Sequence, residues 1–327
     1  MKIMRFIGIV FALFSAGSPS DTSAQDSGKK YKVYMVSNSH LDTQWRWDVK
    51  ATIDDYLYNT AVQNLALLEK YPHYVFNFEG AVKYEWIKEY YPHLFERIRK
   101  FVADGRWNIS GASFEANDPN MPSSESFIRN ILLAQEFYKK EFGIKSKDMF
   151  LPDCFGFSQV MPTLGHHCGL IGFSTQKLSW RTEPLVGDSK TPFPIGLWEG
   201  VDGARIMVAL EPGRYSWNEF PEGDLSANEE LAESARKSPF GIAYRYYGNK
   251  LANGAGDHGG SALPRSIQLL EEGITNGKGP VQLVSATSSQ LYEDYMPYGN
   301  HPELPVFVGE MPLDVHAPGL SLIHISE

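Results

Sequence analysis

Between residues 31 and 150 the sequence alternates between short apolar segments, typical of strands, and longer segments with helical periodicity. The expected strands are KVYMVS, YVFNFEG, RWNISG and DMFLPD, and the expected helices span 52–72, 82–104 and 123–143. Pro92 interrupts the second helix. Such alternation is typical of parallel strands joined by right-handed crossovers. We therefore predict an α/β fold, and both a barrel and an open sheet are compatible with it.

The pattern is looser after Ser179. We expect loops at 181–196 and 211–230, a strand in ARIMVAL, and a glycine-rich segment, LANGAGDHGGSALP, before a helix at 265–272. The chain has 327 residues, of which 43% are hydrophobic, so it can form one large domain or two ordinary ones.

The N-terminal residues have the features of a secretory signal peptide. Lys2 and Arg5 precede an apolar run, 6–14, which is followed by small and polar residues. We predict a signal peptide at 1–24, a spacer at 25–30, and export to the periplasm or beyond the cell. The apolar run is too short to be a lasting membrane anchor. The net charge of -9, with no basic stripe, argues against a nucleic-acid partner. Cys154 and Cys168 are expected to be free thiols.

His40 and Asp42 follow directly after the first expected strand. In an extended segment, side chains two residues apart point to the same side, so the imidazole and the carboxylate would lie together. Both groups are suitable zinc ligands. An ordinary hydrogen bond between the two side chains in a loop is the alternative. The carboxyl ends of parallel strands are where ligands bind in α/β folds, and this favours the metal site.

Two further carboxylates are candidates for the same site. Asp153 follows the fourth expected strand, where it can complete an open zinc site of His/Asp/Asp type, or simply cap the next helix. Asp257 lies within GAGDHGG, whose glycines permit either a close approach to a ligand or a plain turn.

Trp45 and Trp198 are candidates for stacking on a sugar, although tryptophan is more often a core residue. Asp118, in a polar loop before a helix, is a candidate for substrate contact or for a turn. His166 and His167 are adjacent and are interpreted as structural.

Five segments together resemble the glycoside hydrolase family 38 α-mannosidases. They are SHLDTQW, FEANDPNMPSSESFIRN, PDCFGFS, WEGVDGARI and GDHGG, in the order of the family. The resemblance covers roughly residues 31–319 and corresponds to the family's N-terminal catalytic domain. It implies a β/α barrel-like fold with one zinc ion (Zn2+) at the mouth.

The resemblance also implies roles for individual residues. His40, Asp42 and Asp153 match three zinc ligands, Asp153 matches the catalytic nucleophile, and Trp45 lies beside the sugar. Asp257 is the expected acid/base, with His258 or another nearby carboxylate as the alternative. The implied protein is an exported, zinc-dependent, retaining α-mannosidase that hydrolyses terminal α-mannosidic bonds of mannose-containing glycans. A metal-dependent polysaccharide deacetylase or amidohydrolase, and a non-catalytic sugar-binding relic, are the alternatives.

The C-terminal end departs from the family pattern. The family's fourth zinc ligand is a histidine in a His-Asp block that this sequence does not contain, and His316 is not assigned to that role. Residues 320–327, LSLIHISE, match the translation of a transposase adapter used in sequencing libraries. We therefore expect residues 31–319 to be a catalytic domain incomplete at its C-terminus, which folds poorly and is inactive by itself.

Overall fold

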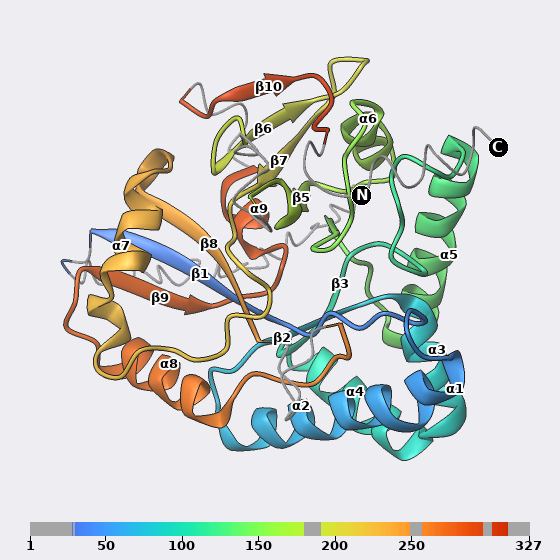
Figure 1. The fold of residues 1–327 in the computed structure, drawn as a ribbon, viewed down its shortest axis with the longest axis horizontal. Helices are drawn as coiled ribbons and strands as arrows, with labels where there is room; N and C mark the ends of the chain where they lie inside the picture. The colour runs from blue at the N-terminus through green and yellow to red at the C-terminus, as the bar shows by residue number, and fades with distance from the viewer. Residues whose placement is uncertain (1–27, 29, 180–190, 249–256, 297–302, 313–327) are drawn as a thin grey trace, which may run out of the picture.

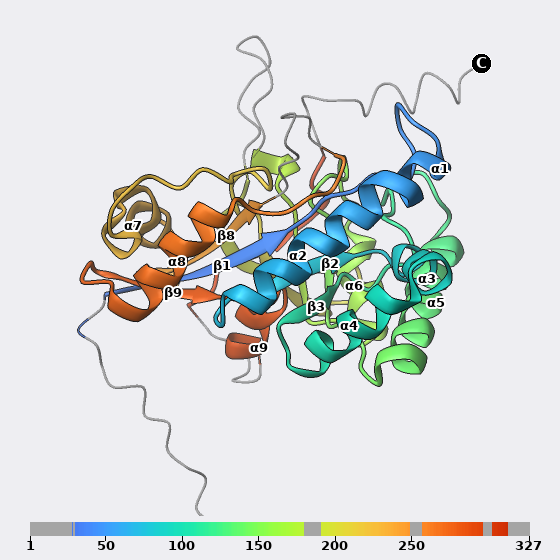
Figure 2. The same ribbon diagram turned by 90° about the horizontal axis from the view of Figure 1, so that it is seen from below.

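The computed structural model describes residues 28, 30–179, 191–248, 257–296 and 303–312. The expected signal peptide, the segment 320–327, and parts of the expected spacer, of the loop at 181–196 and of the glycine-rich segment lie outside these residues. Two five-stranded sheets with helices around them form the fold (Figures 1 and 2). The helices α2, α4 and α8 lie on the side of the first sheet that faces away from the second sheet (Figure 1).

The first sheet is built around one strand. It consists of β1 (Tyr31–Asn38), β2 (Phe76–Glu79), β3 (Trp107–Ser110), β8 (Ile242–Gly248) and β9 (Val281–Ser285), in the order β3-β2-β1-β8. β9 pairs with β1 over 31–35 and β2 pairs with it over 37–38, so these two strands share one edge of β1. All these pairs are parallel. The carboxyl ends of β1 and β2 therefore lie side by side.

The second sheet has the order β10-β6-β7-β5-β4. Its strands are β4 (Asp148–Phe150), β5 (Gly172–Ser174), β6 (Ile195–Glu199), β7 (Arg205–Ala209) and β10 (Val306–Val308). β6 and β7 are antiparallel because a short turn, 200–204, joins them, and the other pairs are parallel. The α/β class is confirmed. The prediction of wholly parallel strands is wrong for this pair, and two sheets do not confirm a barrel.

Most of the expected helices are present. The α-helices are α1 (Val49–Ala51), α2 (Tyr58–Lys70), α3 (Ala81–Tyr90), α4 (Pro92–Ala103), α5 (Ser124–Phe142), α6 (Val160–His167), α7 (Glu229–Arg236), α8 (Pro264–Asn276) and α9 (Gln290–Tyr295). The segment Thr52–Leu57, which was expected to be α-helical, is a π-helix that leads into α2. None of the helices among the described residues is long and apolar enough to cross a membrane.

Local sequence explains how α5 begins and ends. The Ser123 hydroxyl accepts a hydrogen bond from the amide of Ser126 and so caps the first turn. Gly143 follows the last turn with a φ of 75°, a conformation that glycine adopts without strain.

The core divides into three clusters of buried side chains. The largest packs aromatic residues of β2 and β3 (Phe76, Phe78 and Trp107) against α3 and α4. A second cluster lies around Phe173 and Trp198 of the second sheet. His40, Asp42 and Asp153 lie just beyond the ends of β1 and β4, which belong to these packed sheets.

Asp148, at the start of β4, makes stability depend on pH. Its Oδ1 accepts from the Gly111 amide and the Ser146 hydroxyl, whereas its Oδ2 is buried without a hydrogen-bond partner. Burial raises the pKa of this carboxyl to about 6. The folded state therefore binds the proton more tightly than the unfolded state, whose pKa is about 4.

We expect the wild type to lose about 2 kcal/mol of stability relative to Asp148→Asn between pH 4 and pH 7. The folded-state pKa is raised, so this contribution is present at low pH and is lost as the pH rises through 6. Urea unfolding of both proteins at the two pH values measures the difference. A constant difference would contradict the raised pKa.

Candidate functional site

The predicted site residues lie where the chain leaves β1 and where the segment 257–260 returns to it. The amide of Asp42 donates to the carbonyl of Asp257 at 3.0 Å, and the amide of Gly259 donates to the carbonyl of His40 at 2.9 Å. Gly259 has a φ of +74°, and a Cβ there would lie 2.2 Å from the Thr60 hydroxyl. Only glycine lets this segment approach, so GDHGG serves to place Asp257 beside His40.

Three carboxylates converge on one nitrogen of His40. Its Nε2 lies 3.2 Å from Asp42 Oδ1, 3.5 Å from Asp153 Oδ2 and 4.0 Å from Asp257 Oδ1. The structure thus brings together the four residues that the sequence singled out for metal binding and catalysis. The carboxylates are partly exposed, whereas only 4% of the His40 side chain is exposed.

This arrangement fits a divalent cation. Both ring nitrogens of His40 are buried, and neither has a hydrogen-bond partner. His40, Asp42 and Asp257 each offer one ligand atom within 4.8 Å of the others. Asp153 lies at a similar distance from the same imidazole nitrogen. One imidazole and carboxylate oxygens are a donor set that suits zinc.

Two residues that sequence reasoning missed complete the site. Lys177 forms an ion pair with Asp153 Oδ1. The hydroxyl of Tyr215 lies 2.7 Å from Asp257 Oδ1 and 3.3 Å from Asp153 Oδ1. Lys177 lies just after β5 and Tyr215 in the long loop after β7, and only the tertiary fold brings them to Asp153.

The charges of the site keep Asp153 ionised. Burial by itself raises the pKa of Asp153, but His40 and Lys177 outweigh it and lower the pKa to about 2. Burial lowers the pKa of His40, but the neighbouring carboxylates of Asp153 and Asp42 outweigh this effect and raise the pKa to about 10. Without a metal, a protonated His40 balances its carboxylate neighbours, and a bound cation takes over that task.

A cavity of about 220 Å³ adjoins these residues. Asp118 lines it together with His40, Asp42 and Asp153, which places this predicted substrate-contact residue beside the site. The Asp118 carboxylate also accepts hydrogen bonds from the amides of Asn120 and Met121, so it shapes its own loop as well.

The two tryptophans predicted to stack on a sugar, Trp45 and Trp198, lie in different surroundings. Trp45 is 53% exposed in the loop that follows Asp42, and its ring contacts the edge of Trp47. Trp47 stacks on His258, the neighbour of Asp257. Trp198 is fully buried in β6, and its indole N–H donates to the Gly309 carbonyl. Burial leaves Trp198 no free face for a sugar, so the structure does not bring it to the site.

The remaining sequence predictions concern a surface histidine and the two cysteines. His167 pairs with Asp202 at 2.8 Å on the surface. Cys154 and Cys168 are free, as expected, and the Cys154 thiol donates to the Asn117 carbonyl.

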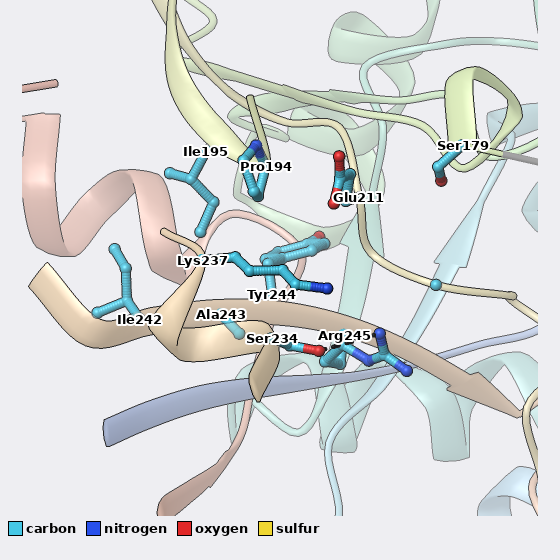
Figure 3. Close-up of a pocket in the computed structure, with 11 residues that line it drawn as sticks. Ser179, Pro194, Ile195, Glu211, Ser234, Lys237, Ile242, Ala243, Tyr244 and Arg245 are labelled. Atoms are coloured by element: carbon cyan, nitrogen blue, oxygen red, sulfur yellow. Dashed lines mark hydrogen bonds between the residues drawn. The ribbon is translucent and has the colours of Figure 1, made fainter. Parts of the chain in front are cut away.

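A second cavity of about 220 Å³ shares no lining residue with the site (Figure 3). Its charged lining residues are Glu211, Lys237 and Arg245, and its floor includes Tyr244. Arg245 pairs with Glu230 at 2.5 Å. Glu211 accepts from the Thr191 hydroxyl. The described lining residues of this cavity include no histidine on which carboxylates converge, as they do around His40.

Comparisons with known proteins agree with this geometry. Residues 30–310 match the model of the glycosyl hydrolases family 38 N-terminal domain. The chain is 31% identical to alpha-mannosidase G of Dictyostelium discoideum over 90% of its own length, and 30% identical to human alpha-mannosidase 2C1 over 88%. It spans only 26% of the length of each of these relatives.

Among solved structures, the chain is similar to an alpha-mannosidase from Enterococcus faecalis V583, with a TM-score of 0.67 and 22% identity. The match covers 86% of this chain and 31% of that one, and it shows that the fold is shared. Since the family model spans most of the sequence, the chain belongs to glycosyl hydrolase family 38, with residues 30–310 matching the N-terminal domain of that family.

Proposed function

We propose that this chain is the catalytic domain of a zinc-dependent, retaining α-mannosidase that hydrolyses terminal α-mannosidic bonds of mannose-containing glycans. One observation carries the proposal: a single Tyr215 hydroxyl contacts both Asp153 and Asp257. These contacts keep the two carboxylate oxygens at most about 6 Å apart, a limit that is compatible with the 5–5.5 Å of retaining glycosidases. The names of the curated relatives point to mannosides as the substrate.

In the proposed mechanism the two carboxylates have different tasks. Asp153, held ionised by Lys177, attacks the anomeric carbon and forms a glycosyl ester as the glycosidic bond breaks. Asp257 gives its proton to the leaving oxygen and then accepts one from the water that hydrolyses the ester. Tyr215 keeps both carboxylates in place throughout.

His40, Asp42 and Asp153 are the residues proposed to hold one zinc ion per chain. Asp257 also lies within reach, and we assign it to acid/base catalysis because its Oδ1 already accepts from Tyr215. When bound, zinc supplies a positive charge that orients sugar hydroxyls. Asp118 and Trp45 are proposed to contact the sugar from the loops that flank the site.

We expect Tyr215→Phe to lower kcat about 10- to 100-fold with little change in KM. The Tyr215 hydroxyl contacts both catalytic carboxylates, and without this hydroxyl the distance between them is no longer held constant. Tyr91→Phe, which removes a hydroxyl bonded to the Ile53 carbonyl, is the matched control. Equal kcat values for the two variants would exclude this role of Tyr215.

The decisive experiment is hydrolysis of an aryl α-mannoside with and without a chelator. The chain spans 26% of the length of its curated relatives, so the assay is made on the chain extended to their full length. Activity must disappear with chelator and return with zinc. A folded, zinc-loaded, extended protein without activity on α-mannosides would refute the proposal.

We further propose that the protein is exported. The support is the charged and apolar pattern of residues 1–24. Mature protein recovered from the source cells should begin at Gln25. An intact N-terminus on cytosolic protein would contradict export.

A further inference from the structure

We propose that Glu79, held by Lys83, is a positioning residue for His40. It accepts the proton of the imidazole Nδ1 and thereby presents Nε2 to the metal. This inference rests on the metal site proposed above. It assigns a role to Glu79 and Lys83, two buried charged residues that take no part in the proposed mechanism.

Strand register places the two residues together. β1 and β2 are parallel, with Ser37 opposite Phe76 and Asn38 opposite Asn77. Glu79 is the last residue of β2, and His40 lies two residues beyond the end of β1. The parallel register therefore brings the backbones of the two residues close together.

Glu79 approaches the Nδ1 edge of the imidazole, and the other carboxylates approach the Nε2 edge. Glu79 Oε1 lies 3.9 Å from His40 Nδ1, whereas Asp42, Asp153 and Asp257 approach Nε2. Both side chains are 4% exposed, and Nδ1 and Glu79 Oε2 are buried without hydrogen-bond partners. Among the described residues, no other carboxylate approaches Nδ1 in an ion-pair contact. A hydrogen bond requires the 3.9 Å between Nδ1 and Oε1 to shorten to about 3 Å, and we propose that this happens when the metal is bound.

Lys83 forms an ion pair with Glu79 and so fixes the position of its carboxylate. Its ammonium group is fully buried and lies 2.8 Å from Glu79 Oε1. It belongs to the first turn of α3, where the helix dipole disfavours a cation. Gly80, with a φ of +89°, leaves room for it, since a Cβ there would lie 3.3 Å from the Lys83 Nζ. A buried ion pair is weak evidence for stability, and this one is better explained by its contact with His40.

The chemistry requires such an acceptor. An imidazole that binds a metal through Nε2 must keep its remaining proton on Nδ1. A carboxylate that accepts this proton fixes both the tautomer and the ring orientation, and losing such a partner typically lowers metal affinity about 10- to 100-fold.

The test compares zinc affinity, measured by competition with a chelating dye, in the unsubstituted chain and in variants. Glu79→Gln combined with Lys83→Met removes both buried charges at once and so leaves no unpaired ion. We expect this double variant to remain folded and to bind zinc about 10- to 100-fold more weakly. Glu271→Gln removes a carboxylate from His73 on the surface and is the matched control, with unchanged affinity.

A second measurement does not depend on the folding of any variant. In the zinc-loaded unsubstituted chain, nitrogen-15 NMR should show a proton on His40 Nδ1 that exchanges slowly with water. A metal-bound Nδ1, or wild-type affinity in the folded double variant, would overturn the role of Glu79. Absence of zinc binding by the unsubstituted chain would overturn the metal site itself.

Discussion

Asp153→Asn is expected to lower kcat for an aryl α-mannoside by about 10⁴-fold or more in the extended protein, the range seen when a nucleophile is removed. An amide cannot form the glycosyl ester, and the variant is nearly isosteric with the wild type. Asp153 lies 3.5 Å from His40 and pairs with Lys177, and these cations lower its pKa to about 2, so the carboxylate is ionised at neutral pH. Pre-steady-state kinetics should show that the variant forms no covalent intermediate.

Asp202→Asn is the matched control for this substitution. Asp202 is also a carboxylate in contact with a histidine, His167, but this pair lies on the surface away from the site. Its loss should leave kcat unchanged. If Asp153→Asn retained more than about a tenth of the activity, another carboxylate would have to be the nucleophile.

Zinc is expected to stabilise the wild-type chain, and His40→Ala should abolish this effect. Zinc at a thousand times its dissociation constant adds about 4 kcal/mol of stability, which raises Tm by about 10 °C in a domain of this size. Alanine removes the one nitrogen ligand on which the carboxylates converge. Thermal unfolding with zinc and with chelator measures the shift.

His167→Ala is the control for the metal experiment, because it removes an imidazole from the exposed Asp202 pair. It should keep the full zinc-dependent shift. An equal shift in His40→Ala would place the metal at other residues and would remove the basis for the proposed ligand set.

Local sequence was sufficient for the first half of the fold. The strands around Tyr34, Phe76, Trp107 and Phe150 are short apolar runs next to clear helix signals, and all four are present. The π-helix at Thr52–Leu57 was missed because its apolar spacing resembles that of an α-helix. The strands β8 and β9 were missed because they lack helix signals of comparable clarity on both sides.

The site residues also divide into those that local sequence predicts and those that depend on the tertiary fold. His40, Asp42 and Asp153 follow strands that are evident from sequence, so their meeting could be predicted. Tyr215 and Lys177 lie in segments whose path depends on tertiary packing, and nothing in their local sequence marks them. Glu79 did leave a signal, since it is a charged residue at the end of a strand that is evident from sequence.

The strands that pair with β1 are far apart in the sequence, and this affects folding during biosynthesis. β2 is made within about forty residues of β1, but β8 and β9 follow only at 242–248 and 281–285. At about 5–20 residues per second, a ribosome needs about 12 to 50 s to supply them. During that interval most of β1 has no partner strand, and Asp257 has not yet reached His40. The nascent chain therefore acquires its complete cation site only after nearly the whole domain has been synthesised.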